Sequence, residues 1–271
     1  MKTIRFGILA TGDIAARLAD TIATVEHAEV LAVGSRNLEK AEAFAKAHNI
    51  PRAYASYEEL CSDPDVDIIY IATPHSHHYE NMLMCIEHGK HILCEKSFTV
   101  NADQAKEVAR LAKEKNIHTC LDTSGITYRL GASSYNEKLD ALMEVTDLVM
   151  LDIKHIDPEG HKILTGHDNA GILAFARYLE EKQVDVWIRH VVVPGVTDDE
   201  DFLTRLGTFL GTLSNVKALD VLPYHIMGIT KYEQLDMDYP LKGVPPATKE
   251  QAARAKKIIL TAYWKQKRRV Q

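Results

Sequence analysis

The chain has 271 residues, of which 46% are hydrophobic and 26% are charged, and its formal net charge is −6. These proportions are ordinary for a globular protein and allow one large domain or two modest ones. The small negative charge offers no basic field for nucleic acid, and no stretch reaches the roughly 18 apolar residues of a membrane span. We therefore expect neither nucleic-acid nor membrane binding, and a cytoplasmic location.

Short β-branched runs alternate with amphipathic stretches along the whole chain, which predicts βα units, a parallel sheet and an α/β fold. The expected strands are Ile4–Leu9, Val30–Val33, Ile68–Ala72, His91–Cys94, His118–Asp122, Leu148–Asp152, Val186–Val193 and Leu219–Pro223. A helix is expected over Asp103–Lys115, with Asn101 as its N-cap and Gln104 three residues later. The rhythm has no repeats and no obvious linker.

The first chemical motif is FGILATGDIA at Phe6–Ala15, a strand that runs into a small-residue turn and then a helix. Ala10, Gly12 and Ala15 occupy the positions of a G-x-G-x-x-G/A turn. The first helical residues, Asp13 and Ile14, would present their N–H groups and the helix dipole to a pyrophosphate. A tight strand-to-helix turn without a ligand is the alternative interpretation.

The second strand should end in an acidic residue if it binds the ribose 2′-hydroxyl of NAD. Here it ends in Ser35 and Arg36. A hydroxyl and a guanidinium suit a 2′-phosphate, so NADP is the predicted cofactor. The alternative is a solvated arginine that opens the next helix at Asn37.

Residues 1 to about 116 resemble the nucleotide-binding domain of the glucose-fructose oxidoreductase, inositol dehydrogenase and MocA (Gfo/Idh/MocA) family, within it the dihydrodiol or xylose dehydrogenase branch. The resemblance rests on FGILATGDIA, VGSRNLEKAEAFA, AYASYEEL, VDIIYIATPHSHHYE and HGKHILCEKSFTVN. It implies that Thr73, Pro74 and His75 lie under the nicotinamide. It also implies that Glu95 and Lys96, from an E-K-P motif, lie beside the site of hydride transfer. Ser97 stands where the family has proline.

The histidines of the H-x-H-H run lack a nearby carboxylate or cysteine set, so no metal site is expected. In the Gfo/Idh/MocA family a second α/β domain closes over the substrate. From Asn116 onward this sequence departs from that pattern.

From about residue 112 to 265 the chain resembles the later part of the pyruvate formate-lyase-activating enzymes, which are radical S-adenosylmethionine (SAM) proteins. The resemblance rests on IHTCLDTSG, EVTDLVMLDIKHIDPEGHKILTGHDN, VDVWIRHVVVPGVTDDEDF, NVKALDVLPYH and LKGVPPATKEQ. It implies a partial (βα) barrel with a vestigial SAM site at the C-terminal ends of its strands.

The resemblance also implies a role for each residue of that site. Lys154 would meet the SAM carboxylate and His225 the nucleoside, while Arg189 would face a peptide substrate. Asp122, Thr123 and Asp152, with the Met150 backbone, would hold a monovalent cation. Taken from the residues alone, Asp152 and Lys154 form an Asp-x-Lys pattern that is more often a local ion pair.

The four cysteines argue against radical chemistry. Cys61, Cys85, Cys94 and Cys120 lie 24, 9 and 26 positions apart, whereas a [4Fe–4S] cluster of this family needs C-x-x-x-C-x-x-C. We therefore expect no cluster, SAM as an unlikely ligand, and reduced thiols in the core.

The sequence is thus interpreted as a chimera of a Rossmann-like half, residues 1–116, and a partial (βα) barrel half, residues 117–271. If one sheet continued across the splice it would leave an exposed edge, so a homo-oligomer is expected. Three hypotheses remain open: an NADP(H)-binding module with no complete active site, an NADP-dependent oxidoreductase that uses Lys96, and a structural chimera without ligand function. These hypotheses differ on whether the chain is an enzyme.

Overall fold

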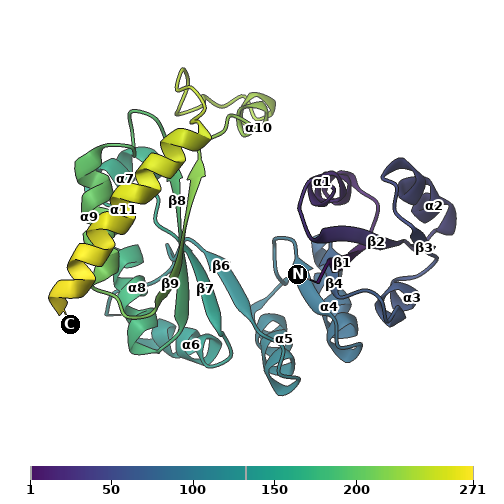
Figure 1. Ribbon diagram of the computed structural model, residues 1–271. Helices are drawn as coiled ribbons and strands as arrows, with labels where there is room; N and C mark the ends of the chain where they lie inside the picture. Colours follow the sequence, from purple (N-terminus) through teal and green to yellow (C-terminus); the bar gives the residue numbers. More distant parts are fainter. Residues whose placement is uncertain (1, 132, 271) are drawn as a thin grey trace. The chain divides into compact units, whose positions relative to one another are not determined.

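The structure is a computed structural model that describes residues 2–131 and 133–270, and it divides into two compact units, Met1–His118 and Thr119–Gln271. Each unit has its own parallel sheet (Figure 1), which confirms the α/β class. The continuous sheet considered at the splice does not form, because β5 and β6 belong to different sheets.

The first unit is a doubly wound Rossmann-type fold. Its sheet has the order β3-β2-β1-β4-β5, so the chain reverses direction across the sheet between β1 and β4. The elements are β1 Ile4–Leu9, α1 Asp13–Ile22, β2 Ala28–Gly34, α2 Leu38–Ala47, β3 Arg52–Tyr54, α3 Tyr57–Ser62, β4 Ile68–Ile71, the 3₁₀ helix η1 His75–His77, α4 His78–Glu87, β5 His91–Cys94 and α5 Ala102–Glu114.

Helices cover both faces of this sheet. On one face, α1 and α2 pack Ala15, Ala19 and Phe44 against Ile8 and Val33. On the other face, α3, α4 and α5 contribute buried side chains to a second cluster around Leu9, Ile69 and Ile71; they are Leu60, Cys61, Met82, Cys85, Ile86, Val108 and Ala112. A sheet buried on both faces explains why its strands are short continuous apolar runs.

The helix predicted after Asn101 is confirmed as α5. The Asn101 side chain accepts hydrogen bonds from the N–H groups of Asp103 and Gln104, at 3.1 and 3.0 Å. The Gln104 side chain in turn accepts from the N–H of Val100. These bonds satisfy N–H groups that the helix itself leaves without partners.

The second unit is built on a four-stranded parallel sheet in the order β6-β7-β8-β9. This open sheet has the partial (βα) barrel character expected from the sequence. The elements are β6 Cys120–Thr123, α6 Ser133–Met143, β7 Leu148–Asp152, α7 Pro158–Thr165, α8 Ala170–Glu181, β8 Asp185–Val192, α9 Glu200–Gly211, β9 Val216–Pro223, α10 Ile229–Gln234 and α11 Lys249–Val270.

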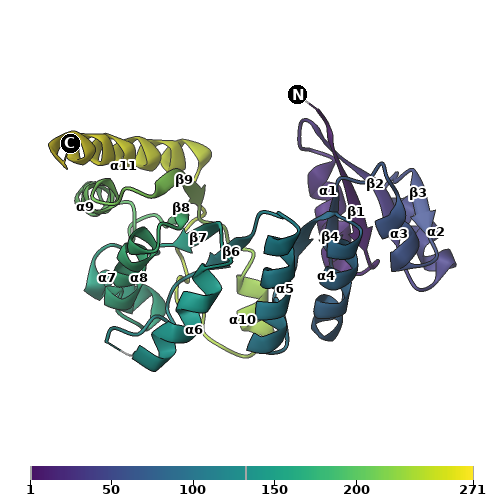
Figure 2. The same ribbon diagram turned by 90° about the horizontal axis from the view of Figure 1, so that it is seen from below.

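The core of the second unit lies on one face of its sheet. Figure 2 shows α8, α9 and α11 gathered on one side of β7, β8 and β9. Their buried residues, including Phe175, Leu206 and Ile259, pack against Val186 and Ile188 of β8. On the opposite face of β8, Trp187, which alternates with these two strand residues, is 43% exposed.

Two glycines set the close approach of α9 and α11. A Cβ atom on Gly207 would lie 2.2 Å from the backbone oxygen of Ile259, and one on Gly211 would lie 2.7 Å from that of Tyr263. Any larger residue would therefore push the two helices apart.

None of the helices in the described part of the chain is both long enough and apolar enough to cross a membrane.

Among the described residues of the second unit, three histidines are buried: His155, His161 and His190. The His155 Nε2 lies 3.1 Å from the oxygen of Val196, and the His190 Nδ1 lies 2.8 Å from that of Ile153. The Nε2 atoms of His161 and His190 are enclosed without a hydrogen-bond partner in the described structure. Burial lowers the pKa of both His155 and His190.

We predict that acid destabilises the second unit. The unfolded chain takes up protons on His155 and His190 near their ordinary pKa of 6.5, while the folded unit resists protonation. The unfolded state therefore binds more protons below pH 6.5, and the free energy of unfolding falls as the pH decreases, by at most about 1.4 kcal/mol per pH unit for each histidine.

Urea unfolding between pH 8 and pH 5 tests this, followed by tryptophan fluorescence, because both tryptophans, Trp187 and Trp264, lie in the second unit. His190→Gln should show a shallower dependence than the unchanged protein. A free energy of unfolding that stays constant over this range would contradict the prediction.

Candidate functional site

A cleft of about 630 Å³ opens in the first unit, where the sheet order reverses. It lies at the C-terminal ends of β1, β2 and β4, the place where open α/β sheets bind ligands. Its lining consists of Ala10, Thr11, Gly12, Ser35, Arg36, Lys40, Tyr57, Ala72, Thr73, Pro74 and His75.

The turn after β1 forms the floor of this cleft. Ala10 has a φ of +86°, a conformation that suits glycine, and its N–H donates to the oxygen of Gly34 at 3.0 Å. Gly12 is the N-cap of α1 and provides no side-chain acceptor. A Cβ atom on Gly12 would meet nothing within 4 Å, so the space before the helix is open. The first N–H groups of α1 can thus face an anion there.

Two cations stand at the end of β2. Arg36 follows Ser35 directly and precedes Asn37, the N-cap of α2, while Lys40 lies in the first turn of that helix; both basic side chains line the cleft. Tyr57 from α3 faces them: burial raises the pKa of its hydroxyl, and the nearby Arg36 lowers it in part. The described residues that line the cleft include these two cations and no carboxylate.

Side chains of α4 make hydrogen bonds to the segment that follows β4. The side-chain amide of Asn81 donates to the hydroxyl of Thr73 at 2.8 Å, and both residues are buried. The Nε2 of buried His78 lies 2.8 Å from the Thr73 backbone oxygen. Thr73 is therefore fixed through its side chain and its backbone.

Glu95 and Lys96 follow β5 at the same edge of the sheet. The Tyr70 hydroxyl donates to Glu95 at 2.6 Å, and the N–H of Glu95 pairs with the oxygen of Ile71. Burial first, and then Glu95, raise the pKa of Tyr70. Lys96 is exposed and does not line the cleft.

The structure brings most of the predicted cofactor residues to this one cleft; they are Ala10, Gly12, Ser35, Arg36, Thr73, Pro74 and His75. Asp13 and Ile14 form the first turn of α1, just beyond the lining. Sequence reasoning missed Lys40 and Tyr57.

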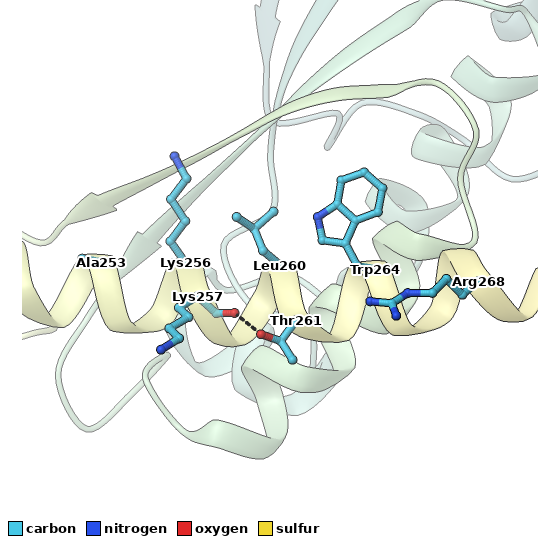
Figure 3. A pocket seen from close by; sticks show the side chains of 7 residues that line it. All are labelled: Ala253, Lys256, Lys257, Leu260, Thr261, Trp264 and Arg268. Carbon is cyan, nitrogen blue, oxygen red and sulfur yellow. Dashed lines mark hydrogen bonds between the residues drawn. The ribbon is translucent and has the colours of Figure 1, made fainter.

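A second surface hollow follows α11 and is lined by Ala253, Lys256, Lys257, Leu260, Thr261, Trp264 and Arg268. Figure 3 shows that these side chains all come from one helix and point in different directions, with Lys256, Leu260 and Trp264 on one side and Lys257 on the other. A site needs polar groups that converge on a ligand. This hollow lacks that feature, so the cleft of the first unit is the better candidate.

Four of the residues predicted for the vestigial SAM site form one ion-pair network at the C-terminal ends of β6, β7 and β8. Arg189 donates to both carboxylate oxygens of Asp122, at 2.9 and 2.7 Å, and to Asp152 at 2.6 Å. Lys154 donates to the other oxygen of Asp152 at 2.7 Å.

Two further residues predicted for that site stay outside the network. The Thr123 hydroxyl accepts from the N–H of Gly125, and His225 is exposed beyond β9.

Each charged group of this network is paired with an opposite charge inside the network. Burial would raise the pKa of Asp152, but hydrogen bonds from Arg189 and Lys154 outweigh it and hold that pKa below its usual value. Asp152, and after it Asp122, raise the pKa of Arg189. The guanidinium therefore stands between the two carboxylates that the resemblance would give to a monovalent cation.

The cysteines do not fit an iron–sulfur cluster. Cys61 and Cys85 face each other in the core of the first unit, with their Sγ atoms 3.7 Å apart. Burial raises the pKa of Cys94 to about 12, which favours the thiol over the thiolate that ligates iron. Cys120 belongs to the second unit. No group of three His, Cys, Asp or Glu residues within residues 2–131 and 133–270 could hold a metal ion.

We predict that Ala10→Gly stabilises the first unit. The left-handed conformation destabilises alanine by about 1 kcal/mol but not glycine. Glycine also raises the conformational entropy of the unfolded chain, which offsets part of this gain. The amide protons of β1 should therefore exchange more slowly with deuterium in the variant. Ala16→Gly, inside α1, is the matched control and should speed their exchange. Equal effects of the two changes would contradict the prediction.

We also predict that Arg189→Met destabilises the second unit by about 2 kcal/mol, because it leaves Asp152 enclosed without its main partner. Urea unfolding monitored by tryptophan fluorescence measures the loss. The exposed pair of Lys217 and Asp185 provides the control, and Lys217→Gln should change stability little. If both variants unfold at the urea concentration of the unchanged protein, the network does not contribute to stability.

Comparison with known families also finds two different segments in the chain. Residues 4–121 match the model of the Gfo/Idh/MocA oxidoreductase family, described as having an NAD-binding Rossmann fold, and residues 83–206 match the radical SAM superfamily. The two matches overlap over residues 83–121. Each covers less than half of the chain.

Curated relatives of the C-terminal part are pyruvate formate-lyase-activating enzymes. The protein from Streptococcus mutans is 49% identical over 173 residues, which cover 64% of this chain and 65% of that protein. The pyruvate formate-lyase 1-activating enzyme of Escherichia coli K12 is 44% identical over 160 residues, covering 59% and 63%. The chain thus spans less than two thirds of the length of these relatives.

Solved structures of oxidoreductases are similar to part of the chain. An NAD-binding oxidoreductase from Klebsiella pneumoniae has a TM-score of 0.41 and 28% identity, and the match covers 43% of this chain and 33% of that one. The UDP-N-acetylglucosamine 3-dehydrogenase GnnA from Acidithiobacillus ferrooxidans has a TM-score of 0.40 and 27% identity, covering 44% and 38%. The chain therefore combines a segment similar to the Gfo/Idh/MocA oxidoreductases with a segment similar to the radical SAM activating enzymes.

Proposed function

We propose that the first unit binds NADP(H), and that the chain is a nucleotide-binding module without a complete active site from either of the two families it resembles. The observation that carries this proposal is the pair of cations, Arg36 and Lys40, at the cleft end of β2. A 2′-phosphate carries up to two negative charges. It would gain charge-assisted hydrogen bonds from both side chains, whereas a ribose hydroxyl finds no carboxylate acceptor in the lining.

The turn after β1 suits the remaining part of a dinucleotide. The pyrophosphate would lie before α1, where Gly12 leaves open space and the helix start offers N–H groups. Asp13 in the first turn is a negative charge that such a ligand must tolerate. The nicotinamide end would reach Thr73, Pro74 and His75.

When bound, NADPH would supply a hydride. The residues of this chain that could take part in proton transfer nearby are Glu95 and Lys96, because β5 ends beside β4 at the cleft edge. A second candidate function, an NADP-dependent oxidoreductase, rests on this placement. The exposed Lys96 would have to turn toward the cleft, and the substrate wall would have to come from elsewhere.

The second unit supports no radical chemistry in this proposal. Its network of Asp122, Asp152, Lys154 and Arg189 is satisfied internally, so SAM would have to displace ion pairs in order to bind. The four cysteines offer no cluster site in their observed positions. We assign this unit no catalytic role.

Calorimetric titration with NADPH, NADH and SAM tests the proposal. We expect micromolar binding of NADPH, weaker binding of NADH and no heat with SAM. Arg36→Ala and Lys40→Ala should each weaken NADPH binding by about tenfold or more, because each removes a charge-assisted hydrogen bond. Neither variant should alter the affinity for NADH.

Lys46→Ala is the matched control, because Lys46 is exposed near the other end of α2 and does not line the cleft. It should bind NADPH as the unchanged protein does. Reduction of dicarbonyl or sugar substrates that is lost in Lys96→Ala would favour the oxidoreductase instead. No heat with any of the three ligands would leave a structural chimera without ligand function.

A further inference from the structure

His78 is enclosed and has two partners of the same kind. It is the first residue of α4 and has no exposed surface. Its Nδ1 lies 2.6 Å from the backbone oxygen of Ser97, and its Nε2 lies 2.8 Å from the backbone oxygen of Thr73. Both partners are carbonyl oxygens, which can only accept a hydrogen bond.

The number of protons on the ring follows from this geometry. A neutral imidazole carries one N–H, so it can donate to one of the two oxygens and must point a lone pair at the other. An oxygen at 2.6 or 2.8 Å from that lone pair would be repelled. The imidazolium form donates to both oxygens and leaves neither bond unmade.

The two oxygens belong to the two segments that meet at the edge of the cleft. Thr73 follows β4 and lines the cleft, and its hydroxyl is held by Asn81, one turn further along α4. Ser97 follows Lys96 on the loop after β5. The ring of His78 is therefore a bridge between the end of β4 and the loop that carries Lys96.

We propose that His78 is a positioning residue which, as a buried imidazolium, ties the Lys96–Ser97 loop to Thr73 at the edge of the nucleotide cleft. The proposal deepens the proposed function, and its effect on NADPH rests on it. Burial and the positive end of α4 oppose a charge at this position. Two short bonds to carbonyl oxygens favour it, because a charged donor makes stronger hydrogen bonds.

Other ionisable groups near the ring must be considered in any pH dependence. The ring of His75 lies with its centroid 5.5 Å away, edge to face. Titratable side chains beside it on α4 or on the loop after β5 include His77, Tyr79, Glu80, Glu95 and Lys96. On the neighbouring helix α5, Glu107 accepts a hydrogen bond from the Tyr79 hydroxyl. In the described structure, Glu80 lies 3.9 Å from His77, and Glu95 accepts from Tyr70.

The proton count can be measured directly on the full chain. In ¹⁵N spectra of protein labelled on histidine, we expect His78 at pH 7.5 to show two ring nitrogens that each carry a proton, both slow to exchange with water. The signals should disappear in His78→Gln. They should remain in His77→Gln, the matched control, because His77 is part-exposed and lies outside the cleft. A single ring N–H on His78 would overturn the proposal.

The positioning role has a second measurement. In His78→Gln both N–H donors sit on one nitrogen atom, so they cannot replace donors on two separate ring nitrogens. Deuterium exchange around residues 95–99 should therefore become faster and NADPH binding about tenfold weaker. Unchanged exchange there would refute the tether. If the unchanged protein does not bind NADPH, the proposed function fails. The number of N–H protons on the His78 ring still tests whether His78 is an imidazolium. Should His78→Gln not fold, through-space contacts of the ring with Asn81 would assign the signals.

Discussion

Parallel pairing is the constraint on which both units depend. It places the C-terminal ends of neighbouring strands at one edge, so residues far apart in sequence become neighbours there. In the first unit this edge is hollow, because the chain reverses between β1 and β4. In the second unit the same kind of edge is filled by Arg189, which joins carboxylates from β6 and β7. One rule of pairing thus yields an open cleft in one unit and a closed ion-pair network in the other.

The sequence predicted eight strands that form apolar runs, and the helix α5 with Asn101 as its cap. It missed β3, Arg52–Tyr54, because three residues with a charge at the first position form no apolar run. It identified Arg36 from its place after β2, but not Tyr57, which reaches the cleft from α3. It could not foresee that Arg189 would pair with Asp122 and Asp152, because nothing in local spacing specifies a partner 67 or 37 positions away. Contacts of this kind depend on sheet register, which a single sequence determines only weakly.

The overlap of the two family matches, over residues 83–121, has a physical origin. In this chain the stretch holds the second half of α4, the strand β5, the helix α5 and the start of β6. The structure assigns α5 to the first unit, because Val108 and Ala112 pack in the cluster around Ile69 and Ile71. The next strand, β6, pairs with β7 instead of β5. One run of alternating helices and strands thus lies within both family matches, while the buried residues of α5 belong to the core of the first unit.

The paired thiols of the first unit have a practical consequence. Cys61 and Cys85 are fully enclosed between α3 and α4, under the helix that carries His78. An alkylating reagent can reach them only when this part of the unit opens, so their rate of labelling reports the frequency of local opening. Cys120 of the second unit is exposed, so its labelling needs no such opening and can serve as an internal reference. Mass spectrometry of the labelled chain would thus compare the labelling rate of Cys61 and Cys85, which depends on local opening of the first unit, with that of Cys120 in the second unit.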